Sequence, residues 1–418
     1  MLGYFFGKNS WYVFTSFYCQ AEVIHLYEDM NMAFRIRHPK LFSCLAVIVT
    51  LTLTKIVWVQ CSCRDLGTFE SEKEDILERR AYLIEKVVTT PEKLLDEMPA
   101  AIGPQFQGEW ALYSCSMLAA ALENISRIYP ETRAESAGLI DSLITIVLSP
   151  EIRAYDRERW GEDPLESLDG ESSHISYLSH VALMIARYKS VGGGMEYDRL
   201  FHSICRTMDR RIRESDNLNL PTYPREYVYV PDMLVAIVAL NRYSWLYRGK
   251  YDSTVRHWLD RAEAEWINEE TGLLVSFLGK DGGYREWLPV KGSYSALNCY
   301  YLTALDEEFA REQYVALKDN FLKRFPFTGF KEYHDRGCLL GMDIDAGPII
   351  FNLSPSGTAF AVGSITYFND GEVRRRLLKT AEVAGTTISR DRRSHYLLAD
   401  IALVGEAIML AMRTNVKS

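Results

Sequence analysis

The feature that most constrains this chain is an alternation between two kinds of helix-periodic segment along residues 65–418. One kind carries charge along one face and occurs at 134–149, 196–214, 253–268, 308–325 and 372–388. The other kind is poor in charge, rich in Ala, Ser, Leu and Tyr, and occurs at 108–129, 174–190, 229–247, 292–305, 355–369 and 395–413. A helix that is apolar nearly all round is buried. The alternation therefore predicts charged outer helices and buried inner helices.

The inner segments recur at intervals of roughly 60 residues, and a repeated interval of this kind is typical of a repeat architecture. With a further periodic segment at 73–90, the chain supplies six helical hairpins. We expect an all-α fold that closes into an (α/α)6 barrel, because no terminal hairpin shows the polar capping face of an open solenoid. Strand-like alternation is scarce, and Leu273–Phe277 is the clearest candidate for a short hairpin.

The first 64 residues differ in charge from the rest of the chain. They carry six Lys or Arg and three Asp or Glu, which gives this segment a net charge of +3. Because the whole chain has a net charge of −9, the remaining residues carry −12. An apolar run at about 41–60 follows the basic residues Arg35, Arg37 and Lys40. A run of this length behind a positive flank is typical of a membrane span or of a secretory signal.

We favour an uncleaved transmembrane signal-anchor, because no small-residue cleavage site follows the run. The chain then divides into a cytoplasmic segment with its transmembrane helix at 1–64 and the barrel domain at 65–418. The positive-inside rule places the barrel on the non-cytoplasmic side of the membrane. Met30 and Met32 are alternative starts, and a start at Met32 would leave a conventional signal.

Composition excludes several classes of function. A net charge of −9 argues against nucleic acid as a partner, since binding phosphates needs a basic face. The barrel segment has no CxxC or Cys/His spacing, so we expect no metal, and its cysteines are interpreted as buried apolar residues. It also has no P-loop, dinucleotide fingerprint, nucleophile elbow or HExxH, so we expect no cofactor. A small-molecule substrate is expected, and a homo-oligomer is left open.

Candidate site residues gather in six stretches that enter the inner helices, where a toroid would place a pocket. Glu109, Trp110 and Tyr113 stand at helical spacing in the first inner segment. Trp160 belongs to a loop that we interpret as the mouth of the pocket and as part of its substrate-binding wall. Tyr113 has the same binding role, whereas His174 is interpreted as a surface residue.

Four residues are the candidates for acid–base catalysis: His180, Glu226, Asp232 and Tyr294. His180 stands alone on an apolar helix, where it is either a satisfied core histidine or a pocket acid, base or hydrogen-bond donor. Asp232 follows Pro231 and is either a helix cap or, in an aromatic pocket, a carboxyl with a raised pKa. Glu226 is weighed in the same way, and Tyr294 is a candidate phenolic donor. Nearby Tyr223 and Tyr227 are predicted to bind substrate.

Asp343 and Asp345 are two residues apart in MDIDAGP and are followed by Gly and Pro. In an extended segment their side chains point the same way. Three interpretations stay open for the pair: hydrogen bonding within the loop, catalysis or substrate binding, and a calcium ligand pair. We take substrate binding as the working hypothesis.

Several motifs together resemble the linalool dehydratase/isomerase family. They are WGEDPLE (160–166), SHVALM (179–184), YPREYVYVPDM (223–233), INEETGLLVSF (267–277), EWLPVKGSYSA (286–296) and DIDAGP (343–348). The resemblance covers roughly residues 105–415, and the order of the motifs is more specific than any one of them. It implies an exported (α/α)6 barrel and a cofactor-free dehydration, hydration or isomerisation of an allylic alcohol.

The same resemblance implies a pocket histidine at His180 and a pocket tyrosine near Tyr294. This sequence departs from the pattern where the family's type enzyme carries two cysteines, because Tyr223 and Asp232 stand there. Linalool itself is therefore a doubtful substrate.

Three functions follow from the sequence. The first is a membrane-anchored enzyme that resembles linalool dehydratase/isomerase and acts on a small, partly apolar alcohol by acid–base chemistry. The second is a carbohydrate-active hydrolase on the same barrel that uses paired carboxylates, such as Asp343 and Glu226. The third is a non-catalytic binding toroid.

Overall fold

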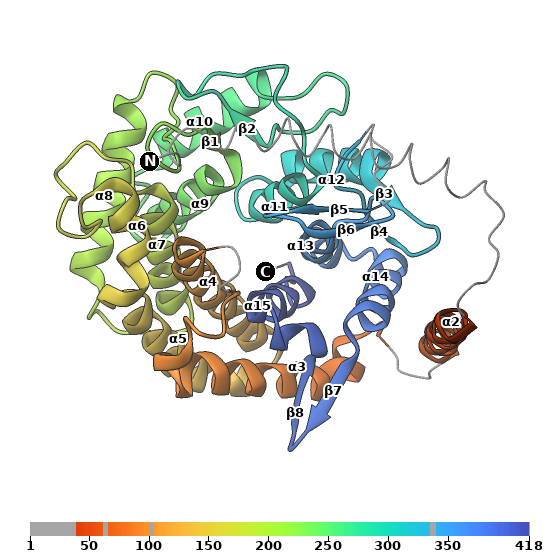
Figure 1. Ribbon diagram of the computed structural model, residues 1–418. Helices are drawn as coiled ribbons and strands as arrows, with labels where there is room; N and C mark the ends of the chain where they lie inside the picture. The colour runs from red at the N-terminus through yellow and green to blue at the C-terminus, as the bar shows by residue number, and fades with distance from the viewer. Residues whose placement is uncertain (1–38, 62–65, 100–102, 335–339, 418) are drawn as a thin grey trace, which may run out of the picture.

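The computed structural model describes residues 39–61, 66–99, 103–334 and 340–417. This part of the chain forms fourteen α-helices and four small antiparallel sheets of two strands each. Figure 1 looks along the axis of the assembly and shows the helices arranged as two concentric rings. The predicted all-α toroid is confirmed at this level.

The inner ring consists of the charge-poor helices. Neighbouring members contact one another, and the ring closes where the last of them packs against the first. They are α4 (Pro104–Ile128), α7 (Ile175–Ser190), α9 (Val230–Leu246), α11 (Gly292–Leu302), α13 (Pro355–Tyr367) and α15 (Leu403–Arg413). On α7, every residue from Ile175 to Tyr188 is buried, as the all-round apolar pattern predicts.

The outer ring consists of the charged segments, each of which precedes an inner helix in the chain. They are α3 (Phe69–Leu83), α5 (Arg133–Val147), α8 (Asp198–Glu214), α10 (Asp252–Glu265), α12 (Glu307–Phe321) and α14 (Gly371–Gly385). On α8 the buried side chains include Phe201, Ile204, Met208 and Ile212, which follow the helical period. Because outer and inner helices alternate, all six inner helices run in the same direction.

Ion pairs between the two ends of the chain fasten the ring. Arg413 on α15 donates to Asp75 at 2.6 Å and to Glu72 at 2.7 Å, both on α3. Arg79 on α3 donates to Glu406 on α15 at 2.6 Å. Arg374 of α14 also pairs with Glu72. These three arginines and three carboxylates form a buried network of balanced charge, which we call the ring-fastening network. A balanced network is the form in which buried charges are tolerated.

Two segments differ from the sequence-based prediction. Residues Pro150–Trp160 form an additional helix, α6, which begins at the cap Ser149 and ends at Gly161 in a left-handed conformation. The apolar pattern did not reveal it, because Ile152, Tyr155 and Asp156 are its only residues classed as buried. The predicted helix at 395–413 is wrong in its first part. There the chain completes a β-hairpin and passes through a 3-10 turn, and α15 starts only at Leu403.

Short antiparallel pairs decorate the loops. The strands are β1 (Val228–Tyr229), β2 (Phe277–Leu278), β3 (Leu322–Lys323), β4 (Gly329–Phe330), β5 (Leu340–Asp343), β6 (Gly347–Ile350), β7 (Thr387–Arg390) and β8 (Arg393–Tyr396). The segment near Leu273–Phe277 makes the predicted short hairpin, in which Leu274 bridges Ile267, and its end also pairs with a distant segment, since Phe277 lies opposite Tyr229 in the β1–β2 sheet.

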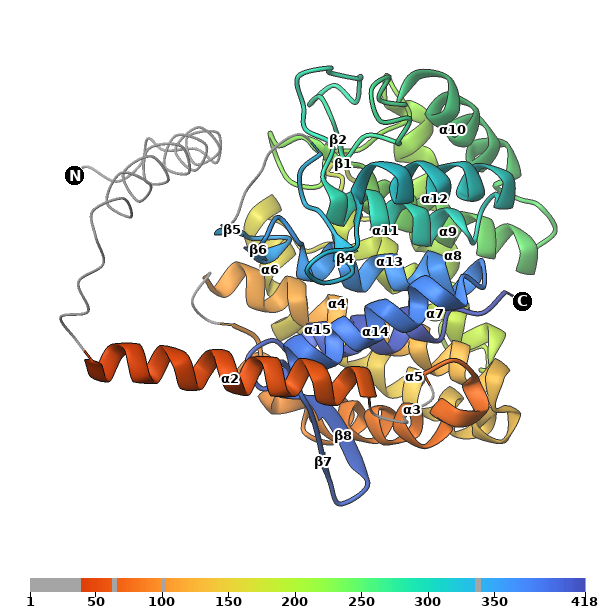
Figure 2. The ribbon, with the colours of Figure 1, turned by 90° about the vertical axis from the view of Figure 1, so that its right-hand side faces the viewer.

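The predicted membrane segment at about 41–60 coincides with helix α2 (Pro39–Cys61). Figure 2 shows α2 on the outside of the toroid beside α14, with its Pro39 end projecting past the rings. Lys55 of α2 donates to the carbonyl of Val383 at 2.7 Å. Among the described residues, no helix combines the length and the hydropathy that a membrane span needs. The predicted membrane anchor stays a prediction, and residues 1–38 with the predicted boundary at 64 lie outside the described residues.

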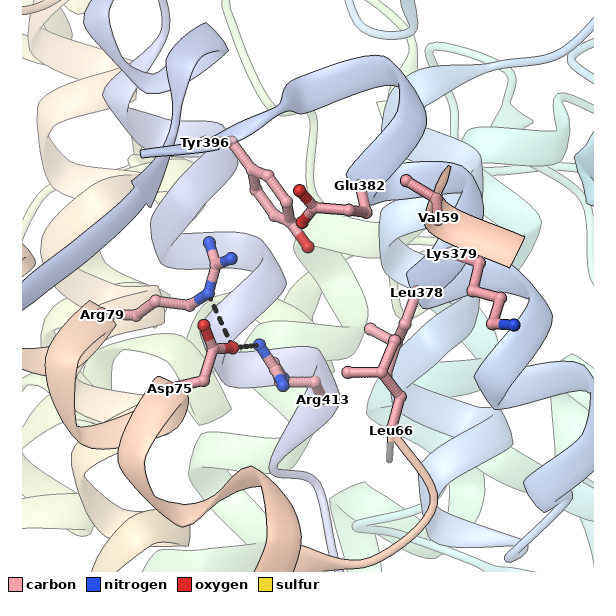
Figure 3. A pocket seen from close by; sticks show the side chains of 9 residues that line it. All are labelled: Val59, Leu66, Asp75, Arg79, Leu378, Lys379, Glu382, Tyr396 and Arg413. Atoms are coloured by element: carbon pink, nitrogen blue, oxygen red, sulfur yellow. Dashed lines mark hydrogen bonds and ion pairs between the residues drawn. The ribbon is translucent and has the colours of Figure 1, made fainter. Parts of the chain in front are cut away.

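A small pocket lies between α2 and the ring-fastening network. Figure 3 shows its lining, in which Val59 of α2 faces Asp75, Arg79 and Arg413. The three charged side chains are already bonded to one another or to other network members. The pocket lies among the helices that close the ring, and none of the predicted site residues is part of its lining.

Candidate functional site

The first turns of the inner helices bring together most of the residues predicted to form a site. Asp232 stands in the first turn of α9, Tyr294 in the first turn of α11 and His180 in the second turn of α7. Because the inner helices run in parallel, these turns lie at the same end of the toroid, which we call the amino end. Figure 2 shows the β5–β6 hairpin at this end and the carboxyl terminus of the chain at the other.

Asp232 is the most perturbed carboxyl group at the amino end. Burial raises its pKa to about 7, and the nearby charges of Glu109 and Asp345 add to the rise, against a hydrogen bond from Thr222 that lowers it. The side chain keeps partial exposure. A buried carboxyl without a cationic partner protonates instead of staying charged. Asp232 is therefore positioned as a carboxylic acid that can donate a proton near neutral pH.

Tyr113 of α4 is a neighbour of both His180 and Asp232. The Tyr113 ring meets the His180 ring edge-on, with the two centroids 5.2 Å apart. Asp232 is close enough to contribute to the raised pKa of Tyr113, whose main cause is burial. The structure thus brings three predicted site residues from three inner helices into one cluster.

His180 is fully enclosed and neutral. Its Nδ1 lies 2.8 Å from the Ser116 hydroxyl. Burial lowers the pKa of the ring to about 3, and the charge of Arg187 lowers it further. A histidine held neutral across the physiological range acts as a hydrogen-bonding group. The predicted acid or base role of His180 stays a prediction, and its buried, hydrogen-bonded setting agrees with the alternative of a satisfied core histidine.

Three buried tyrosines lie near the carboxyl groups of this cluster: Tyr113 and Tyr301 near Asp232, and Tyr223 near Glu109. The Tyr113 and Tyr301 hydroxyl groups interact with each other, and that of Tyr223 interacts with Ser176, but none of the three has a partner within 3.5 Å among the described residues. The Arg159 guanidinium lies over the Tyr223 ring at 3.7 Å and approaches Glu109 at 3.6 Å. Buried polar groups are normally satisfied, so these weakly bonded hydroxyl groups beside a carboxylic acid are candidates for ligand contacts.

A second cluster at the amino end is aromatic. Tyr294 packs against Phe277 with centroids 5.0 Å apart and against Tyr229 at 6.1 Å. The Tyr229 hydroxyl donates to Glu226 at 3.1 Å. The β1–β2 pairing sets these contacts, because it places Tyr229 opposite Phe277. Glu226 and Tyr294 therefore belong to the wall of this cluster.

Tyr227 extends the same wall toward solvent. Its ring meets that of Trp287 edge-on, with centroids 5.9 Å apart. Trp287 is two-thirds exposed, which makes this pair the outer rim of the aromatic cluster.

Asp343 and Asp345 both bind Lys291, but Asp343 ends strand β5 and Asp345 stands in the turn that follows, so the pair does not lie in one extended segment. The Lys291 Nζ lies 2.8 Å from Asp343 and 3.1 Å from Asp345, although the lysine is only 1% exposed. Asp343 also accepts the backbone N–H groups of Asp345 and Ala346. These contacts agree with hydrogen bonding within the loop. Substrate binding by the pair stays a prediction, and the described residues contain no group that could hold a metal ion.

Lys291 is the central residue that sequence reasoning missed. Its third carboxylate neighbour is Glu332 at 3.7 Å, which also accepts hydrogen bonds from the Ser293 backbone and hydroxyl. Burial raises the pKa of Glu332 to about 7 against the charge of Lys291. A lysine just before an apolar inner helix was the available signal, since a charge there needs buried partners.

Trp160 and His174 form a separate contact. Trp160 ends α6, and its ring lies 5.3 Å from the His174 ring. The interpretation of His174 as a surface residue is wrong, because it is fully buried and bonded through Nδ1 to Asp156 at 2.5 Å. No ring, hydrogen-bond or ion-pair contact joins Trp160 to Asp232 within the described residues.

Comparisons with known proteins bear on the fold. No protein-family model matches the chain, and no curated protein matches it. Among solved structures, the chain is similar to a glycoside hydrolase from family 105 of C. acetobutylicum ATCC 824, with a TM-score of 0.54 and 10% sequence identity. The similarity covers 81% of this chain and 99% of that chain. At this identity it shows a shared fold, and the resemblance to linalool dehydratase/isomerase stays a prediction.

Proposed function

We propose that this protein is a cofactor-independent hydrolase of the α/α-toroid type that cleaves a glycosidic C–O bond, with Asp232 as the proton donor. The observation that carries the proposal is the position of Asp232. It is a carboxyl group with a pKa near 7 in the first turn of an inner helix, beside Tyr113 and under the influence of Glu109.

Cleavage of a C–O bond needs an acid that is still protonated at working pH, because the departing oxygen must receive a proton. Asp232 meets this requirement. Glycoside hydrolysis also uses a second carboxylate to activate water or to attack the sugar carbon. Glu109, whose charge acts on Asp232, is the residue we assign to this role in place of the predicted Asp343. The carboxylate of Asp343 already accepts hydrogen bonds from Lys291 and from two backbone N–H groups.

The buried hydroxyl groups of Tyr113, Tyr223 and Tyr301, none of which has a partner within 3.5 Å among the described residues, support a substrate with many hydroxyl groups of its own. Each can exchange a hydrogen bond with a sugar, and the exposed ring of Trp287 offers an apolar surface for a sugar face. The fold similarity to a glycoside hydrolase agrees with this substrate class.

A second candidate is the dehydration or isomerisation of a small allylic alcohol, as the sequence resemblance implies. The aromatic cluster of Tyr229, Phe277 and Tyr294 favours it, since the faces of aromatic rings stabilise developing positive charge. The same acid, Asp232, would protonate the departing hydroxyl.

A substrate panel separates the two. The purified protein is incubated with a library of oligosaccharides, followed by chromatography of the products, and with C5–C15 allylic alcohols, followed by gas chromatography and mass spectrometry. We expect sugar release that the Asp232→Asn variant lacks. Turnover of an allylic alcohol without sugar release would replace the first candidate with the second. Turnover of neither class, or equal turnover by the variant, would reject the assignment of Asp232.

A further inference from the structure

The opposite end of the toroid, where the inner helices finish, holds an unbalanced cluster of charge. Glu123 of α4 is buried, and its carboxylate accepts one hydrogen bond of 2.6 Å from each of three guanidinium groups, those of Arg127, Arg187 and Arg242. The Ser190 hydroxyl also donates to Glu123 at 2.7 Å. Three guanidinium groups therefore share one carboxylate, and we call these four residues the arginine cluster.

The surplus of positive charge has no acidic partner in the vicinity. Within the described residues, the side chains of Arg127, Arg187 and Arg242 bond only Glu123 and, through Arg187 at 3.4 Å, the Tyr300 hydroxyl. Burial lowers the pKa of Arg127 against the attraction of Glu123, and the charges of Arg242 and Arg187 lower it further. The cluster thus carries a net charge of about +2, since guanidinium groups stay protonated.

Neutralising helix ends does not account for this surplus. The dipoles of the inner helices make this end partly negative and favour cations there. However, no arginine of the cluster bonds a terminal carbonyl of its helix within the described residues. On α7 that task falls to Arg133 of α5, which donates to the carbonyls of Ser190 and Val191. The ring-fastening network gives the contrast, because it balances its arginines one for one.

The cluster is open on one side. The side chains of Arg127 and Arg242 are 33% and 23% exposed, whereas that of Arg187 is 6% exposed. Arg127 and Arg242 each donate to Glu123 through a single nitrogen. The other N–H groups of each guanidinium can therefore donate to a ligand. The Nε of Arg187 is buried and has no hydrogen-bond partner within the described residues.

We propose that the arginine cluster is a binding site for a small oxyanion with two negative charges, of the phosphate or sulfate class. Arg127 and Arg242 contact the anion, and Arg187 supplies charge from beneath them. The fork of donors on a guanidinium matches the oxygens of such anions and makes charge-assisted hydrogen bonds to them. The site lies where the inner helices finish, whereas Asp232 lies where they begin, and none of its contacts is used in the proposed hydrolysis.

Isothermal titration of the full-length protein with inorganic phosphate, sulfate and acetate at fixed ionic strength tests this site. We expect one saturable site for phosphate and sulfate, with acetate weaker by at least about fivefold because it carries one charge. The Arg127→Gln/Arg242→Gln double variant should bind phosphate at least about tenfold more weakly. Arg213→Gln is the matched control, since Arg213 is 61% exposed on outer helix α8 and pairs with Asp209. It should bind as the unaltered protein does.

Absence of saturable phosphate binding to the unaltered protein would overturn the proposal, as would unchanged affinity in the double variant. Circular dichroism verifies that the double variant is folded. If it is not, Arg127→Gln alone decides, because Arg127 is the most exposed member of the cluster. A loss of about threefold or more supports the site, and an unchanged affinity rejects it.

Discussion

The two ends of the toroid place buried carboxyl groups in opposite electrostatic settings. At the amino end, burial raises the pKa of Asp232 to about 7, with no cation among the groups that shift it. At the carboxyl end, burial also opposes the charge of Glu123, but Arg242, Arg187 and Arg127 outweigh it and hold the pKa of Glu123 well below its usual range.

Helix dipoles alone would predict the reverse order, since they favour a charged carboxylate at an amino end. The comparison teaches that desolvation and direct partners decide the charge of each group. At the amino end, Asp232 keeps a proton that it can donate. At the carboxyl end, Glu123 stays ionised and binds three arginines. Four predictions follow from this contrast, and they run from the largest expected effect to the smallest.

The largest effect is expected on turnover in Asp232→Asn. An amide cannot donate the proton to the departing oxygen, so kcat should fall by about 100- to 10,000-fold. In the unaltered protein, kcat should decline above pH 7 as Asp232 loses its proton, because its pKa is raised to about 7. The measurement is a pH–rate profile on the substrate that the panel identifies. A profile with no decline between pH 6 and 9 would contradict the role of Asp232.

The second prediction concerns the carboxyl end. Glu123→Gln leaves three guanidinium groups without their carboxylate, so the free energy of unfolding should fall by about 3–5 kcal/mol at pH 7. Because the pKa of Glu123 is depressed in the folded state, its contribution is present at neutral pH and is lost as the pH falls below about 4.5. Urea unfolding at pH 7 and pH 4 measures this difference. Equal stability of variant and unaltered protein at pH 7 would show that the cluster does not depend on Glu123.

The third prediction concerns His180→Gln. The neutral ring bonds Ser116 and contacts Tyr113, so we expect it to position the tyrosine without exchanging protons. Turnover should fall by roughly 10- to 100-fold, in the lower range of single catalytic contacts. The decline of the rate above pH 7 should stay where it is, because Asp232 causes it. If that decline moves or disappears, His180 is itself the titrating group.

Much of the fold was predictable because it rests on local periodicity. Helices such as α8 and α9 begin and end within two residues of their predicted bounds, since the apolar period is read directly from sequence. Helix α6 was not predicted, because its three buried residues are too few to form an apolar stripe in the sequence. The β7–β8 hairpin was not predicted either, since Tyr396, Leu397 and Leu398 continue the apolar pattern of the helix that follows.

The site was predictable in part for the same reason. Asp232 and His180 could be placed at one end, since each lies in the first two turns of an inner helix, and Tyr113 follows in the third turn of α4. Their charges could not be predicted, because a pKa depends on desolvation and on neighbours that the chain brings from far away. Lys291 meets Asp343 across 52 positions of sequence, and Glu123 meets Arg242 across 119. No local pattern records such pairs.

The most direct test of the central claim needs no substrate. It compares the stability of the unaltered protein with that of Asp232→Asn by urea unfolding from pH 4 to pH 8. The pKa of Asp232 is raised in the folded state, so its ionisation is unfavourable there. The free energy of unfolding of the unaltered protein therefore falls as the pH rises from about 4 to 7. We predict equal stability near pH 4 and a variant that is more stable by about 1–3 kcal/mol at pH 8. A difference that does not change with pH, or an unaltered protein that is the more stable at pH 8, would contradict the account.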